Sequence, residues 1–227
     1  MAGVVLICVA LEAADAHAQV SGSASIVSNY RYRGVSLSHN APAAQAALVY
    51  DNPQGFYAGA FASTVRIGNP ASNEVQGIFF AGYARTTPFG ATWEAGVVYS
   101  GFTGATSYAY PELLVGAAYE KISARLYYSP NYYGRGSDAV YGEIDAAHRL
   151  LDHMQLVAHV GVLWTNARNI YGEAFDSIVD GRVGVVFDFD RFNVQLSWVC
   201  ISDANAGYAL TRVRSGNGMV LSVSWLF

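Results

Sequence analysis

The sequence predicts a closed antiparallel transmembrane β-barrel of about twelve strands, with ten or fourteen as alternatives. Three observations predict it: an apolar composition, short segments of alternating polarity, and connections that alternate in length. Of the 227 residues, 52% are hydrophobic and 13% are charged, whereas an ordinary soluble domain has about 25% charged residues. No run of 18 or more apolar residues follows the N-terminus, which excludes spanning helices. A barrel has these properties because only one face of each strand meets lipid.

The C-terminal nine residues show the clearest alternation of polarity. Ser222 and Ser224 fall on one face of the expected strand. The other face is entirely apolar and consists of Met219, Leu221, Val223, Trp225 and Phe227. Such alternation with a period of two is a strong strand signal. The same alternation recurs in residues 192–200, 122–129 and 140–149. Residues 55–64 and 75–85 alternate too poorly for their faces to be assigned.

The predicted connections alternate between long and short along the chain. The long ones are residues 34–43, 67–75, 100–111, 129–138, 165–180 and 202–218. The short ones are residues 51–55, 86–90, 120–121, 150–153 and 189–191. A transmembrane barrel has this rhythm because one rim carries tight periplasmic turns and the other carries extended extracellular loops. A secreted β-sandwich, the alternative fold, has no reason to sort its loops in this way.

Aromatic residues are expected to mark the two membrane interfaces. One group falls near the short turns and comprises Tyr50, Phe56, Tyr119, Phe189 and Phe192. The other group falls near the long loops and comprises Tyr30, Tyr99, Tyr110, Tyr128 and Trp164. These positions predict two aromatic girdles, one at each interface.

The N-terminal residues 1–18 are predicted to be a signal peptide, followed by the barrel at residues 19–227. Residues 2–11 form an apolar segment, and Ala16-His17-Ala18 is a cleavage site of the expected kind. No Lys or Arg opens the segment, so a buried N-terminal helix is the alternative. Cys8 lies inside the apolar segment, and the lone remaining Cys200 supports neither a disulfide nor a multi-thiolate metal site.

The polar faces of the strands predict which side chains line the lumen. The candidates are Arg31, Arg33, Gln45, Glu94, Glu112, Arg125, Glu143, Asp145, Arg149, Gln155, His159, Arg182, Asp188 and Gln195. Five of them are arginines and five are acidic. This balance predicts salt bridges across the lumen and weak ion selectivity, since a selective pore needs an excess of one sign. By the same alternation, Tyr30 and Tyr32 should point outward to a girdle.

The composition and motifs argue against several other functions. A net charge of −4 lacks the positive field that nucleic-acid binding requires. No catalytic residue is assigned, because Ser38 and His39 are adjacent and would point to opposite faces of a strand; a cross-strand dyad in a lipid hydrolase remains a less favoured alternative. No metal site or cofactor is expected, since His148 and His153 lack a third ligand nearby.

Residues 28–45, SNYRYRGVSLSHNAPAAQ, resemble a proteobacterial family of proposed outer-membrane porins, the TorF-like or Gcw_chp group. The family pattern S-x-Y-x-aromatic-R-G-x-S, then P-A-x-Q, is matched at Ser28, Tyr30, Arg31, Tyr32, Arg33, Gly34, Ser36, Pro42, Ala43 and Gln45. Residues 55–63, 108–134 and 140–151 resemble further segments of the family, while Leu37 and Ala46 depart from its pattern. The resemblance therefore covers most of the chain after residue 18.

The resemblance implies an outer-membrane porin, a passive diffusion channel for small hydrophilic solutes or ions. The alternative is a non-conducting structural or surface-binding barrel. Outer-membrane lipids and lipopolysaccharide are the expected partners, and Arg212 and Arg214 either contact lipopolysaccharide phosphates or are solvated loop charges. The strand that ends at Phe227 also resembles the C-terminal signal that the barrel-assembly machinery recognises.

Overall fold

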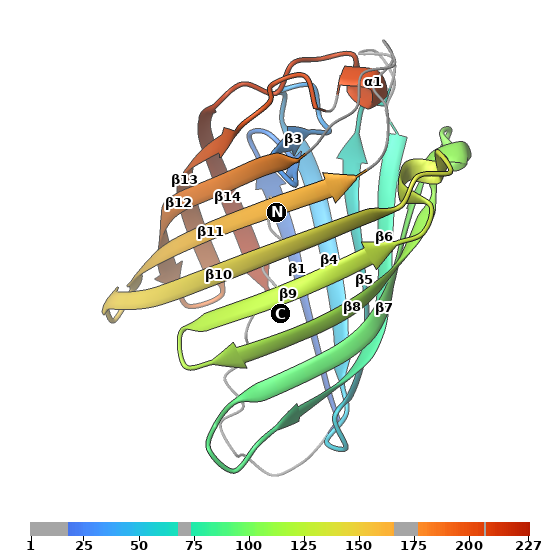
Figure 1. Cartoon of the computed structure of the whole chain (residues 1–227). Helices are drawn as coiled ribbons and strands as arrows, with labels where there is room; N and C mark the ends of the chain where they lie inside the picture. The colour runs from blue at the N-terminus through green and yellow to red at the C-terminus, as the bar shows by residue number, and fades with distance from the viewer. Residues whose placement is uncertain (1–17, 68–73, 166–176, 207) are drawn as a thin grey trace.

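The computed structural model describes residues 18–67, 74–165, 177–206 and 208–227. Within these residues, twelve strands form one closed antiparallel barrel (Figure 1), as the sequence predicts. All of the predicted signal peptide except residue 18 lies outside the described residues. None of the helices in the described part of the chain has the length and apolar character needed to cross a membrane.

Each barrel strand pairs with the strands that precede and follow it in the barrel, and β1 closes the barrel by pairing with the last strand, β14. At this seam Ala24 lies opposite Trp225. The strands are β1 (Gln19–Val27), β4 (Ala43–Asp51), β5 (Phe56–Val65), β6 (Glu74–Thr86), β7 (Thr92–Phe102), β8 (Tyr110–Tyr119), β9 (Ile122–Ser129), β10 (Ala139–Leu151), β11 (Met154–Thr165), β12 (Ile178–Phe189), β13 (Phe192–Ile201) and β14 (Gly218–Leu226).

The two ends of the barrel differ in the length of their connections, which confirms the predicted alternation. The short-turn end carries residues 52–55, 87–91, 120–121, 152–153 and 190–191. At the other end, consecutive barrel strands are separated in the sequence by more residues: 28–42, 66–73, 103–109, 130–138, 166–177 and 202–217. In the described parts of these longer connections lie three short helical turns: η1 (Thr106–Tyr108), η2 (Tyr132–Gly134) and α1 (Tyr208–Thr211).

The outer face of the barrel is apolar around its circumference. Exposed large apolar side chains lie on every barrel strand, among them Ile26, Leu48, Phe79, Val97, Leu113, Leu126, Ile144, Val160, Val183 and Trp198. The apolar face of the last strand is likewise exposed at Met219, Leu221, Val223, Trp225 and Phe227. A soluble protein rarely exposes so large a continuous apolar surface, and this surface is what a barrel presents to lipid.

Eight of the ten predicted girdle residues are exposed on the outer face, and two are not. Tyr30 and Tyr110 are fully buried inside the barrel, so their assignment to a girdle is wrong. The exposed members are Tyr50, Phe56, Tyr119, Phe189 and Phe192 near the short turns, and Tyr99, Tyr128 and Trp164 near the long loops.

Residues 30–37 fold into the barrel as a small hairpin, which we call the inserted hairpin. Its strands are β2 (Arg31–Tyr32) and β3 (Val35–Ser36), and Leu37 N donates to Tyr30 O at 2.9 Å to close it. Figure 1 shows β3 behind β12 and β13, near the end that carries α1. Tyr30 is 0% and Tyr32 5% exposed, so the prediction that Tyr32 points outward is also wrong. The segment is not part of the wall, and side chains on both of its faces are enclosed.

Candidate functional site

The tip of the inserted hairpin presses against the inner wall of the barrel. Arg33 and Gly34 have φ values of 50° and 75°, the left-handed pair that a two-residue type I′ hairpin turn requires. A Cβ on Gly34 would lie 2.7 Å from Asp180 Cβ and 3.0 Å from Ile201 Cδ1, so glycine is needed for both backbone and space. Arg33 adopts a backbone conformation that costs about 1 kcal/mol or more for a side-chain-bearing residue. Its contacts must offset that cost.

Arg33 is held by a buried ion pair and by aromatic rings. Its Nη2 lies 2.8 Å from Glu112 Oε1 on β8, and both side chains are almost fully buried. Burial lowers the pKa of the Arg33 guanidinium, but Glu112 and the neighbouring tyrosines together raise it by more, so the pKa lies above its ordinary value and the group stays charged. The guanidinium carbon lies 5.1, 5.3, 5.5 and 4.3 Å from the ring centres of Tyr32, Tyr127, Tyr132 and Tyr141. Rings at such distances stabilise a cation by cation–π attraction.

Two tyrosines of the inserted hairpin bind further wall strands. Tyr30 Oη donates to Gln76 Oε1 on β6 at 2.8 Å. Tyr32 Oη accepts a hydrogen bond from Tyr110 Oη on β8 at 3.2 Å. Because these residues are buried, each hydrogen bond satisfies polar atoms that water would otherwise have to reach. The hairpin is therefore fixed to the barrel at several points.

Arg31, the other predicted lumen arginine of the inserted hairpin, binds Gly34 of the hairpin and Asn40, which follows it. Its Nη1 donates to Gly34 O at 3.1 Å, and its Nη2 donates to Asn40 Oδ1 at 3.4 Å. Ser36 N donates to Ser215 Oγ in the last long loop at 2.9 Å. Arg31 and Arg33 thus lie inside the barrel on the inserted hairpin, not on a wall strand.

One side of the lumen carries aromatic and charged groups, and we call it the aromatic–charged side. Arg125 Nε donates to Glu94 Oε1 at 2.6 Å, and Tyr57 Oη donates to Glu94 Oε2 at 3.0 Å. A cavity of about 40 Å³ lies here, with space for a few water molecules. Its polar lining consists of Tyr32, Arg33, Tyr57, Glu94, Glu112, Tyr127, Tyr141 and Glu143.

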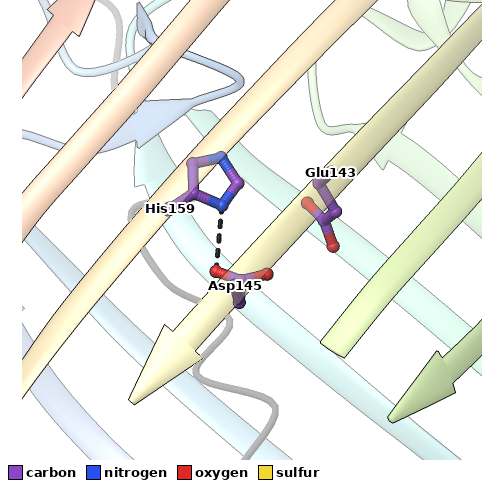
Figure 2. A group of neighbouring side chains, drawn as sticks. All are labelled: Glu143, Asp145 and His159. Carbon is purple, nitrogen blue, oxygen red and sulfur yellow. Dashed lines mark hydrogen bonds and ion pairs between the residues drawn. The ribbon is translucent and has the colours of Figure 1, made fainter. Parts of the chain in front are cut away.

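A network of acidic groups surrounds His159 on the same inner surface. His159 Nδ1 lies 2.9 Å from Asp145 Oδ1, and its Nε2 lies 3.2 Å from Asp180 Oδ1. Tyr141 Oη donates to Asp180 Oδ2 at 3.1 Å. Arg182 Nη2 lies 3.8 Å from Asp145 Oδ1. Figure 2 shows His159 and Asp145 facing each other from neighbouring strands, with Glu143 beside them.

The opposite side of the lumen, which we call the small-polar side, is lined mainly by short uncharged groups. A cavity of about 90 Å³ lies here, and its polar lining consists of Arg182 together with Ser23, Ser25, Gln45, Asn193, Gln195, Ser197, Ser222 and Ser224. Gln45 Nε2 donates to Ser63 Oγ at 3.2 Å, and Gln195 Nε2 donates to Ser197 Oγ at 2.8 Å. The serines and amides offer uncharged donors and acceptors to a hydrophilic solute, and Arg182 is the charged group in this lining.

The remaining predicted lumen residues lie toward the short-turn end. Gln155 Nε2 donates to Asp188 Oδ2 at 3.0 Å. Arg149 is exposed near the end of β10 and lines neither of the two cavities. It therefore takes no part in the charge network of the described lumen.

Asp180 and the buried tyrosines are lumen residues that were not predicted from the sequence. Asp180 was expected at the end of a long loop, whereas β12 begins at Ile178 and buries the carboxylate. With Asp180 added and Arg149 set aside, acidic groups outnumber arginines among the described lumen residues, so the expected balance does not hold for them. The sequence does contain a strand signal here, because residues 178, 180 and 182 alternate with Val179 and Val183, which are exposed on the outer face.

Solved structures with a similar fold come from outer-membrane channels. The KdgM porin in complex with disordered oligogalacturonate has a TM-score of 0.55 and 11% identity, over 93% of this chain and 99% of that one. The NanC porin has a TM-score of 0.56 and 10% identity, over 92% and 98%. The COG4313 outer membrane channel from Pseudomonas putida F1 has a TM-score of 0.52 and 11% identity, over 91% and 94%. At these identities the likeness shows a common fold.

Sequence comparisons identify the family. A search of curated proteins finds no significant match. The family model described as "Bacterial protein of unknown function (Gcw_chp)" matches residues 11–226, nearly the whole chain, in agreement with the resemblance carried by residues 28–45. The protein is a member of the Gcw_chp family.

Proposed function

We propose that the protein is an outer-membrane porin that passes small hydrophilic solutes or ions by passive diffusion. One observation carries the proposal: a closed barrel has a continuous apolar outer face and a polar inner face. In hydrocarbon every backbone N–H and C=O must be paired, and a closed barrel is the way strands achieve this. A polar interior within such a barrel is the arrangement found in porins.

The similar folds of the KdgM and NanC porins support this function. The small-polar side is the part of the lumen best suited to a passing solute, because its serine and amide groups exchange hydrogen bonds with water or solute. The expected export signal at residues 1–18 and the apolar C-terminal strand fit delivery to the outer membrane by the barrel-assembly machinery. Lipids and lipopolysaccharide would then surround the barrel.

A second candidate, a barrel that conducts little or nothing, is favoured by the inserted hairpin. The buried pair of Arg33 and Glu112 and the surrounding tyrosines fill the aromatic–charged side. A barrel closed in this way would act through its wall or its long loops rather than through its lumen.

Planar-bilayer recording distinguishes the two functions. The purified wild-type protein is compared with a variant in which residues 30–37 are replaced by a short Gly/Ser linker. A porin gives small reproducible conductance steps in the wild type and larger steps in the variant. Steps in the variant alone favour the non-conducting barrel, and silence of both folded proteins overturns the porin. Heat-modifiable migration on gels verifies that both proteins are folded.

A further inference from the structure

We propose that Glu143, Asp145 and His159 form a binding site for a divalent transition-metal cation such as Zn²⁺. Glu143 and Asp145 lie two residues apart on the inner face of β10, and Asp145 is directly opposite His159 in the register with β11. One ligand atom from each of the three side chains lies within 4.8 Å of the others. Figure 2 shows the three groups gathered on these two neighbouring strands.

The ligand types and distances suit a borderline cation. Imidazole nitrogen and carboxylate oxygen are common Zn²⁺ ligands, and bond lengths of about 2.0–2.2 Å put tetrahedral ligand atoms about 3.4 Å apart. His159 Nδ1 and Asp145 Oδ1 are 2.9 Å apart, which is within reach of a shared ion. A rotation of the Glu143 carboxylate brings the third ligand in and leaves a fourth position for water.

Asp180 orients the imidazole in the way that protein metal sites usually require. Its Oδ1 lies 3.2 Å from His159 Nε2, and its Oδ2 accepts a hydrogen bond from Tyr141. A carboxylate that accepts the proton of one ring nitrogen leaves the other nitrogen free to bind a metal ion. Here that other nitrogen is Nδ1, the atom that faces Asp145.

Glu143 gives an independent indication that a ligand belongs here. The residue is 3% exposed, and its Oε1 accepts a hydrogen bond from Tyr127 Oη at 3.1 Å. Its Oε2 is buried without a hydrogen-bond partner among the described residues. A buried carboxylate oxygen without a partner is costly, and a bound cation would satisfy it.

The local charge also favours a divalent cation. Glu143, Asp145 and Asp180 are acidic, and in the part of the chain that the structure describes Arg182 is the arginine within ion-pair distance of this group. Arg125 lies opposite Glu143 in the register, but its Nε is bound to Glu94. With a neutral His159, two negative charges remain, and one divalent cation balances both. The alternative to a bound cation is a doubly protonated His159, which would balance only one of these two negative charges.

Isothermal titration of the folded barrel with ZnCl₂ tests the site. The protein in detergent is first stripped with a chelator and transferred to metal-free buffer at neutral pH. We expect one Zn²⁺ per chain and at least tenfold weaker binding in Glu143→Gln and His159→Gln. Asp180→Asn should weaken binding about 10–100-fold, the range for an outer-shell carboxylate. The double variant His148→Gln/His153→Gln removes two histidines outside the cluster and should bind as the wild type does.

Three results would overturn the proposal. They are no stoichiometric binding by the wild type, unchanged binding in a folded His159→Gln variant, and loss of binding in the His148/His153 control. If His159→Gln does not fold, X-ray absorption at the zinc edge of the wild-type complex decides instead. A first shell with one imidazole nitrogen and carboxylate oxygens supports the site, and a shell without imidazole contradicts it.

Discussion

The two sides of the lumen use polar residues in opposite ways. On the aromatic–charged side, charges are buried and matched to specific partners, as in Arg33 with Glu112 and Arg125 with Glu94. On the small-polar side, serines and amides border a cavity about twice as large. The comparison indicates that polarity inside a barrel serves two purposes: paired charges fix the inserted hairpin and the wall, whereas uncharged groups accommodate water and solute.

The largest loss of stability is expected from Glu112→Gln, on the aromatic–charged side. The substitution leaves the Arg33 guanidinium buried without its counter-charge, which typically costs about 3–5 kcal/mol. Denaturant unfolding followed by gel migration measures the loss. The double variant Arg33→Gln/Glu112→Gln should recover part of it, because no charge is then left alone. Equal stability of the wild type and Glu112→Gln would show that the pair does not hold the hairpin.

A smaller loss of unfolding free energy is expected from Gly34→Ala at the tip of the inserted hairpin. The added Cβ meets Asp180 Cβ at 2.7 Å, and alanine is strained at positive φ, so the cost is about 1–3 kcal/mol. The hairpin should shift from the wall, and the single-channel conductance should rise. Gly216→Ala, in a long loop with no atom within 4 Å of the new Cβ, is the matched control. If Gly34→Ala is destabilised but its conductance is unchanged, the inserted hairpin does not border the conducting path.

On the small-polar side, Gln195→Lys should change selectivity rather than stability. The new ammonium enters the cavity bordered by serines, so the reversal potential in a salt gradient should shift toward anions. The unfolding free energy should change by only about 0.5–1.5 kcal/mol, the typical net contribution of the hydrogen bond from Gln195 Nε2 to Ser197 Oγ that the substitution removes. Gln195→Asn is the control, because it shortens the amide side chain without adding a charge. A reversal potential that does not move would place the solute path elsewhere.

The smallest effect is expected from Arg149→Gln at the short-turn end. Arg149 is exposed and lines neither cavity, so its removal should leave conductance unchanged and stability within about 0.5 kcal/mol. Arg125→Gln is the informative contrast, because it removes the partner of Glu94. A selectivity change in Arg149→Gln comparable to that of Gln195→Lys would show that this rim controls ion entry.

The barrel was predictable because period-2 alternation and loop lengths are local properties of the sequence. The inserted hairpin was not, since Tyr30, Arg31, Tyr32 and Arg33 alternate just as a wall strand does. Alternation distinguishes two faces only when one of them meets lipid, and here both faces are enclosed. The tyrosines that surround Arg33 come from β2, β9, the 130–138 loop and β10, a grouping that barrel closure alone creates. Asp180 was missed for a simpler reason, a strand boundary placed too late.

The inserted hairpin also constrains the order in which the chain can fold. Its hydrogen bonds to Gln76, Glu112 and Ser215 join residues 46, 79 and 179 positions apart in the sequence. Contacts of such long range form slowly because each must first close a large loop of chain. β1 and β14 flank the seam and come from opposite ends of the barrel sequence. The hairpin follows β1 and is therefore synthesised early, whereas its partner Ser215 directly precedes β14 and is among the last residues to be made. We therefore expect closure of the seam and enclosure of the hairpin to be coupled steps in folding.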